Sequence, residues 1–252
     1  MDSQALTHHS RCLAGCLYIP FAFPGVPSVG CAFSTIHAGS VSMSVRPEDA
    51  RHAPANRRRL LDAQGLYRWA ELKQVHGDGF VPHAFDTPPE QSSELEADGQ
   101  GTREKGLALV IKTADCQPVL FAAEGGSAVA ALHVGWRGNA MNYPASGLLA
   151  FCVAYGLEPS QVLAVRGPSL GPAAAEFINF SEEWPPGFAA WFDAQRRTMD
   201  LWRLTIDQLV GAGMRADRIF GLDLCTHALP ELFFSHRLGH TGRQASLIWI
   251  KN

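Results

Sequence analysis

Short apolar runs separated by polar, glycine-rich segments form the hydrophobic pattern of this chain. Residues 107–111 (LALVI) and 128–132 (AVAAL) are uninterrupted apolar runs. Such runs are typical of central strands that are covered on both faces. Residues 69–75 (WAELKQV) predict a further strand that ends at His76. Shorter strands are predicted at residues 28–34, 162–165, 218–224 and 245–250.

Helix-forming segments lie between these strands. A helix is predicted over residues 56–64, with Gly65 as its C-terminal cap. Another is predicted to begin at Asn142 with Pro144 in its first turn and to end before Gly156. Two more are predicted at residues 187–196 and 200–209. Segments rich in Gly, Pro and Ser are predicted to be loops, at residues 37–54, 82–105 and 167–172.

Strands and helices are mixed without strict alternation, which predicts an α+β or α/β fold with a large mixed β-sheet core flanked by helices. The chain shows neither an internal repeat of 20–50 residues nor a linker between two halves. We therefore expect one domain over residues 26–252. Residues 1–25 are expected to be an N-terminal extension, with an irregular start followed by an edge segment.

Composition narrows the class of protein. The 252 residues are 46% hydrophobic and 18% charged, which is typical of a compact globular chain and not of a disordered one. The net charge is -3, and the one dense basic run, residues 57–59, is interpreted as a helix face. No nucleic-acid partner is therefore expected.

The cysteines and the N-terminal region bear on the compartment. Six scattered cysteines in a chain of this size do not indicate a disulfide scaffold. The apolar stretch of residues 13–23 is too short to span a membrane and is interrupted by Pro20. No apolar core precedes Cys16, as a signal peptide would require. We expect a cytoplasmic protein without a membrane partner.

Three potential metal ligands lie beside the ends of predicted strands: His76 in QVHG, Cys116 in TADC and His133 in HVGWRG. A rigid sheet presents side chains to a cleft at such positions. Two imidazoles and a thiolate suit zinc, and copper is also compatible. Three protein ligands leave one tetrahedral position open, as in catalytic zinc sites, where the pKa of bound water falls to about 7.

Other interpretations of these residues remain open. A single histidine in a turn is commonly a hydrogen-bonded structural residue, and a buried cysteine is commonly a small apolar filler. Cys116 beside a histidine also fits the thiolate nucleophile of a hydrolase. Asp115 either orients a ligating histidine or completes a turn. Arg137 either binds an anionic group such as phosphate or pairs at the surface. Gln74 is expected to face the same cleft.

QVHG, TADC and H-x-GWRG, in this order, resemble the laccase-domain family. The C-terminal segments ELFFSHR (231–237) and TGRQASLIWI (241–250) agree, so the resemblance spans from about residue 25 to the end. Members were once named polyphenol oxidases and are now described as purine nucleoside phosphorylases with adenosine deaminase activity. The resemblance implies a mixed α/β sandwich and assigns His76, Cys116 and His133 as zinc ligands.

The resemblance also implies two reactions on small molecules. Zinc-bound hydroxide would attack C6 of adenosine and release ammonia, and phosphate would attack C1′ of a purine nucleoside. We expect Cys116 and Asp115 to be catalytic, and Arg137 and Gln74 to contact the substrate. The alternatives are a copper-linked phenol oxidase, a Cys–His hydrolase and a metal-binding protein without turnover. Laccase chemistry needs several coppers, which disfavours the oxidase.

The sequence departs from the family pattern at several positions. Ile36 stands where the family usually has an arginine, and Leu238 falls in a shortened arginine run. The loop over residues 167–176 lacks a Cys and a Tyr that are often present there. These departures lie on the expected substrate side, whereas the metal ligands are intact. A changed substrate is therefore an alternative that the sequence leaves open.

Overall fold

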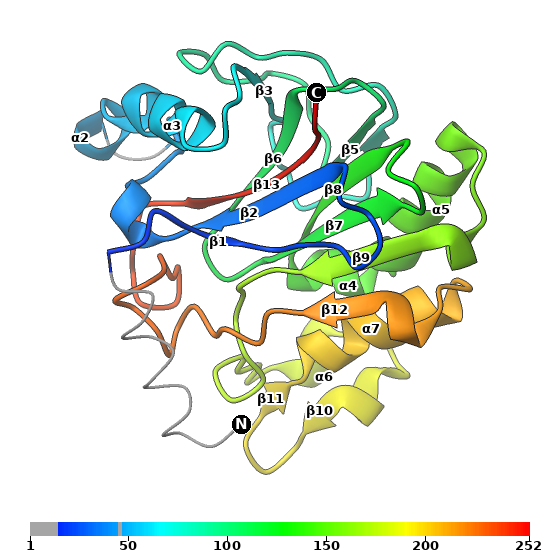
Figure 1. Cartoon of the computed structure of the whole chain (residues 1–252). Helices are drawn as coiled ribbons and strands as arrows, with labels where there is room; N and C mark the ends of the chain where they lie inside the picture. Colours follow the sequence, from blue (N-terminus) through cyan, green and yellow to red (C-terminus); the bar gives the residue numbers. More distant parts are fainter. Residues whose placement is uncertain (1–14, 45–46) are drawn as a thin grey trace.

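Two mixed β-sheets pack face to face in the computed structural model of this chain, which describes residues 15–44 and 47–252 (Figure 1). The first sheet has the strand order β1 (Tyr18–Pro20), β2 (Val29–Ser34), β13 (Gln244–Ile250), β6 (Leu107–Thr113) and β3 (Arg68–Ala70). In this sheet β3 and β6 are parallel, and the other neighbours are antiparallel. The strand β1 is the edge segment expected near the N-terminus, whereas residues 1–14 of the predicted extension lie outside the described residues.

The second sheet has the order β12 (Ile219–Gly221), β9 (Val162–Arg166), β7 (Gln117–Ala123), β8 (Val129–Val134), β5 (Gly99–Thr102) and β4 (Phe80–Val81). Its two edge pairs, β12–β9 and β4–β5, are parallel, and its inner pairs are antiparallel. A small hairpin, β10 (Phe192–Asp193) and β11 (Thr198–Met199), stands apart from both sheets.

Helices cover the outer faces of the sandwich. The helix α3 (Ala53–Asp62) packs on the first sheet, and α5 (Tyr143–Tyr155) and α7 (Leu201–Gly211) pack on the second (Figure 1). The remaining short helices are η1 (Ile36–Ala38), α2 (Pro47–Ala50), α4 (Trp136–Ala140), η2 (Pro159–Gln161), α6 (Phe180–Glu183), η3 (Phe188–Trp191) and η4 (Ala216–Arg218). Within the described ranges, no helix is long and apolar enough to cross a membrane.

The uninterrupted apolar run in β6 has a direct structural cause. Leu109 and Ile111 point into the core between the two sheets, whereas Ala108 and Val110 face the layer under α3. Both faces are therefore dry, and the strand needs no polar positions. The predicted strands at residues 107–111 and 128–132 are confirmed, as are the helices ending before Gly65 and Gly156.

Several strand predictions were wrong or incomplete. The strand β7 was missed, because Pro118 interrupts its pattern. The predicted loop over residues 82–105 contains β5, whose glycine-rich sequence GQGT carries no apolar alternation. The strand predicted over residues 69–75 ends at Ala70. Beyond Ala70, the side chain of Gln74 takes the place of strand-to-strand backbone hydrogen bonds. Its amide nitrogen donates to the carbonyl oxygen of Lys112, and its amide oxygen accepts from the N–H of Lys112.

The helix predicted over residues 187–196 was also wrong. The chain there forms the single turn η3 and then enters the hairpin β10–β11. Gly187 has a φ of 104° and Arg197 a φ of 55°, so turns interrupt the segment at both ends. Its aromatic side chains, Phe188 among them, pack in one cluster around Trp184. The strand predicted over residues 218–224 covers only β12, and the predicted loop over residues 37–54 includes η1 and α2.

Candidate metal centre

His76, Cys116 and His133 converge although they come from different parts of the fold. Their ligand atoms all lie within 4.8 Å of one another. The two imidazole rings are 4.8 Å apart, edge to face, and Cys116 Sγ lies 3.8 Å from His76 Nε2. Cys116 occupies the turn between β6 and β7, whereas His133 lies inside β8 and not after its end. The fold therefore assembles one soft donor group from residues that are distant in sequence.

Asp98 holds this group in place, and it was missed by the sequence interpretation. The buried carboxylate accepts hydrogen bonds from the backbone N–H groups of Val75 (3.1 Å), His76 (3.0 Å) and Gly77 (2.7 Å). These bonds fix His76 in the left-handed region, with a φ of 60°. Asp98 Oδ1 also lies 2.7 Å from Nδ1 of His133.

The contact between Asp98 and His133 decides which imidazole nitrogen is available. A carboxylate only accepts hydrogen bonds, so Nδ1 of His133 is the donor. Its other nitrogen, Nε2, is then left for Cys116 or for a metal ion. Carboxylate–histidine pairs of this kind orient metal-binding imidazoles and raise their basicity.

Cys116 and His133 form a coupled ionisable pair. Burial by itself would raise the pKa of the Cys116 thiol, but the charge of His133 and hydrogen bonds from both histidines lower it to about 6. Burial would lower the pKa of His133, but the Cys116 thiolate and Asp98 raise it to about 9. Near neutral pH the metal-free pair is therefore a thiolate and an imidazolium.

We expect iodoacetamide to alkylate Cys116 of the metal-free protein with a pH midpoint near 6, because the thiolate is the reactive species. An unperturbed cysteine would titrate at about 8.5. Mass spectrometry of peptides gives the rate at each pH, with the partly exposed Cys16 as an internal reference in the same digest. A midpoint near 8.5 would rule out the ion pair, and bound zinc should protect Cys116.

Gly135 allows the three ligands to approach one another. A Cβ atom at this position would lie 3.0 Å from Cδ2 of His76 and 3.3 Å from Sγ of Cys116. Both contacts are tighter than ordinary van der Waals packing. A small residue is therefore needed two positions after His133, where the chain leaves β8 for α4.

A cleft of about 480 Å³ opens onto the donor group. Its walls carry Gln74, Lys112, His236 and Arg243 in addition to the three ligands. Gln74 lines the cleft as expected, but its amide is bonded on both sides to Lys112. Lys112 and Arg243 had no role in the sequence interpretation.

Asp115 and Arg137 lie in other surroundings. The Asp115 carboxylate accepts from Thr226 Oγ1 at 2.7 Å and from the backbone N–H of Arg237 at 2.8 Å. Asp115 therefore connects the C-terminal loops to the β6–β7 turn. The carboxylate that forms a hydrogen bond with a histidine of the donor group is Asp98, which bonds His133. Arg137 is exposed on α4, with its guanidinium 4.4 Å from the Trp136 ring, and it does not line the cleft.

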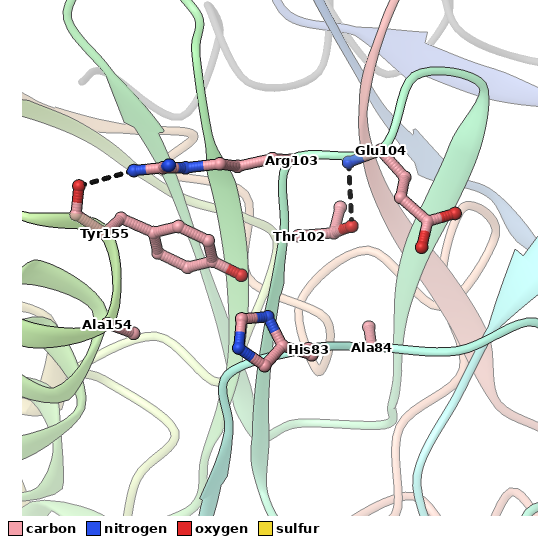
Figure 2. A pocket seen from close by; sticks show the side chains of 7 residues that line it. All are labelled: His83, Ala84, Thr102, Arg103, Glu104, Ala154 and Tyr155. Atoms are coloured by element: carbon pink, nitrogen blue, oxygen red, sulfur yellow. Dashed lines mark hydrogen bonds between the residues drawn. The ribbon is translucent and has the colours of Figure 1, made fainter.

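A second, smaller hollow of about 160 Å³ shares no residue with the cleft (Figure 2). His83, Arg103 and Tyr155 surround it, and Arg103 donates to the carbonyl oxygen of Tyr155 at 2.6 Å. The guanidinium also lies 5.1 Å from the Tyr155 ring. These contacts satisfy the arginine locally. The cleft at the donor group is the candidate functional site because it contains His76, Cys116 and His133.

The chain is similar to known proteins along most of its length. A family model described as "Multi-copper polyphenol oxidoreductase laccase" matches residues 30–251. The chain is 36% identical over 257 residues to "Purine nucleoside phosphorylase" of Xylella fastidiosa (strain Temecula1), covering 90% of this chain and 95% of that protein. It is 33% identical over 210 residues to "Purine nucleoside phosphorylase YfiH" of Escherichia coli (strain K12), covering 79% and 81%.

Solved structures share the sandwich. YlmD from Geobacillus stearothermophilus matches with a TM-score of 0.80 at 25% identity, covering 93% of this chain and 96% of that chain. A Bacillus licheniformis hypothetical protein, YfiH, matches with a TM-score of 0.78 at 26% identity, covering 88% and 93%. The expected mixed α/β sandwich is therefore confirmed.

Proposed function

Because this chain belongs to the multi-copper polyphenol oxidoreductase laccase family, and its relatives are named purine nucleoside phosphorylases, we propose that it is a metal-dependent purine nucleoside phosphorylase. Phosphate and a purine nucleoside would give the free base and ribose 1-phosphate. The glycosidic C–N bond breaks, a C–O bond to phosphate forms, and the base takes up a proton. The observation that carries the proposal is the donor group of His76, Cys116 and His133 within a cleft large enough for a nucleoside.

The donor group fits a zinc ion. It offers two imidazoles and a thiol whose pKa is lowered to about 6, so the sulfur is available as thiolate at neutral pH. Asp98 orients His133 through Nδ1, as the partner of a ligating histidine does. A zinc ion held there would supply a Lewis acid and a water of lowered pKa, which is also what hydrolytic deamination of adenosine requires.

The residues of the chain prepare the site in two ways. Asp98 keeps Nδ1 of His133 protonated and Nε2 turned away from it, so the imidazole is oriented before any ligand binds. The hydrogen bonds from residues 75–77 to the same carboxylate fix the backbone around His76. Little side-chain entropy therefore remains to be lost when ligands are bound.

The test is product analysis by chromatography after incubating zinc-loaded protein with adenosine, with and without phosphate. We expect free adenine that depends on phosphate, and inosine that forms in its absence. Replacing Cys116 with alanine should remove both products, whereas the matched Cys16→Ala change should not. A metal-replete sample that gives neither base nor inosine from any purine nucleoside would contradict the proposed function.

A Cys–His hydrolase is a second candidate that one observation favours. Asp98, His133 and Cys116 form a chain of carboxylate, imidazole and thiolate, which is the arrangement of an activated cysteine nucleophile. Activity of such an enzyme would survive a chelator and be lost on alkylation. Activity of the proposed metalloenzyme would be lost with the chelator and restored by zinc.

Two further outcomes have distinct signatures. Within the described residues, one group of His, Cys, Asp or Glu side chains is arranged to hold a metal ion. A single copper ion bound by this group would support phenol oxidation only weakly. Oxygen uptake by the copper-loaded protein in the presence of a phenol measures this oxidase activity directly. A binding protein without turnover would bind a nucleoside and zinc while giving no product.

A further inference from the structure

A buried charge cluster adjoins the cleft through Lys112. Arg57 and Glu71 are both fully buried, with Arg57 Nη2 2.9 Å from Glu71 Oε2. Lys112 Nζ lies 3.0 Å from the same carboxylate oxygen. Arg57 belongs to the basic run of α3 that was interpreted as a helix face, but its side chain points inward. One buried carboxylate is therefore shared by two cations.

Arg57, Lys112 and Glu71 together carry one more positive than negative charge, and the cation that reaches the cleft is Lys112. Arg57 donates Nε to the carbonyl oxygen of Val41 and Nη1 to that of Gln91, both at 2.8 Å, and its Nη2 faces Glu71, so the guanidinium is held inside the protein. Lys112 is the member that lines the cleft, with 14% of its side chain exposed. Burial lowers the pKa of Lys112 despite Glu71, so its ammonium gains from a further anionic partner.

Arg243 adds a second cation to the same wall. It immediately precedes Gln244 of β13, which pairs with Thr113 of β6, the strand that carries the lysine. Its Nη1 donates to the carbonyl oxygens of the two preceding residues, both at 2.8 Å. Across residues 15–44 and 47–252, no carboxylate forms an ion pair with Arg243.

Glu94, the carboxylate that lines the cleft, pairs with neither cation, whereas the charges of Cys116 and Asp115 favour the charged form of Arg243. Glu94 is 87% exposed and lies 3.8 Å from Lys73, which also pairs with Glu96 at 3.0 Å. Thr113 also lines the cleft, and its buried hydroxyl has no hydrogen-bond partner among the described residues. Beside the metal ligands, the cleft thus offers the cationic side chains of Lys112 and Arg243 and the hydroxyl of Thr113, which has no partner in the described part of the chain.

We infer that Lys112 and Arg243 form the subsite that binds inorganic phosphate as the second substrate. The inference rests on the proposed phosphorolysis, and it assigns the phosphate to the wall formed by the ends of β6 and β13. A lysine and an arginine suit a phosphate dianion, because both donate charge-assisted hydrogen bonds. Glu71 holds the Lys112 ammonium in place, so little side-chain entropy is lost on binding.

Direct binding of inorganic phosphate to the zinc-loaded full chain tests this subsite by calorimetry. Lys112→Met keeps the shape of the side chain but removes its charge, and should raise the Kd for phosphate about tenfold or more. Lys112→Arg should restore most of the affinity. Lys73→Met is the matched control, because it removes an exposed lysine of the same cleft, and it should change the Kd less than about twofold.

Thermal unfolding and zinc content of each variant identify a purely structural effect. If Lys112→Met folds, binds zinc and keeps the wild-type Kd for phosphate, the subsite is refuted. If Lys112→Met does not fold, Arg243→Gln decides, since this change leaves the buried pair of Arg57 and Glu71 untouched. An unchanged Kd in Arg243→Gln would equally refute the inference.

Failure of the subsite and failure of the proposed function give different results. Phosphate binding that depends on Lys112, without any cleavage of nucleosides, would refute the phosphorylase and retain the subsite. Phosphorolysis with an unchanged KM for phosphate in Lys112→Met would retain the phosphorylase and refute the subsite. If both are correct, Lys112→Met raises the KM for phosphate while the KM for the nucleoside stays close to that of the wild type.

Discussion

Replacing Cys116 with alanine should abolish stoichiometric zinc binding. Structural zinc sites with four ligands bind with about 10–16 kcal/mol, so one ligand of such a set contributes about 3 kcal/mol. Loss of the thiolate should therefore raise the Kd for zinc at least about a hundredfold. The loss falls on zinc affinity more than on folding, because the side chain is small and only partly buried at the β6–β7 turn.

Zinc content after dialysis, measured by atomic emission, checks this result, and thermal unfolding reports on the fold. Cys16→Ala is the matched control, since Cys16 is also partly exposed but lies outside the donor group. We expect the control to retain one zinc per chain. Full retention of zinc in Cys116→Ala would show that the three side chains are not the metal site.

Replacing Asp98 with alanine should destabilise the protein and weaken zinc binding together. The change leaves the backbone N–H groups of residues 75–77 and Nδ1 of His133 without their acceptor. Each unsatisfied buried donor costs about 1–3 kcal/mol, and partial access of water reduces the sum. We expect the free energy of unfolding to fall by about 3 kcal/mol or more, and zinc affinity to fall about 10- to 100-fold.

Urea denaturation of the metal-free protein separates the two effects, because it measures stability without zinc. Asp98→Asn keeps the side-chain volume, but its amide NH₂ group would face the backbone N–H groups of residues 75–77, which are also donors. Asp98→Asn should therefore be little more stable than Asp98→Ala. Asp86→Ala is the control, since Asp86 also accepts from a backbone N–H, that of Trp69, but is 45% exposed. The control should cost less than about 1 kcal/mol. Equal losses at both positions would refute the assigned role of Asp98.

The hydrophobic pattern and the helix-capping residues predicted those strands and helices whose burial is visible in their own sequence. The apolar runs in β6 and β8 are dry on both faces, and α5 ends where Gly156 adopts a φ of 65°. Local rules failed where a tertiary contact replaces a local signal. Gln74 joins β6 through its side chain, and the segment after Gly187 follows its aromatic cluster and not a helical pattern.

The same division holds within the candidate site. His76, Cys116 and His133 were predicted as a set because each lies beside the end of a predicted strand and because the three motifs around them resemble those of the laccase-domain family. Their convergence was not derivable from spacing, since 39 and 16 residues separate them and only the sandwich brings them within 4.8 Å.

Asp98 and Lys112 carried no signal in the sequence, because each acts through a partner that lies far along the chain. Asp98 bonds His133 across the β5–β8 ladder, and Lys112 pairs with Glu71 between β6 and the segment that follows β3. The sequence alone determined which chemistry is available, namely a soft donor set and the strands that carry it. The tertiary structure decided which carboxylate orients the histidine and where the cations meet, because hydrogen bonds and charges act over distances that only folding sets.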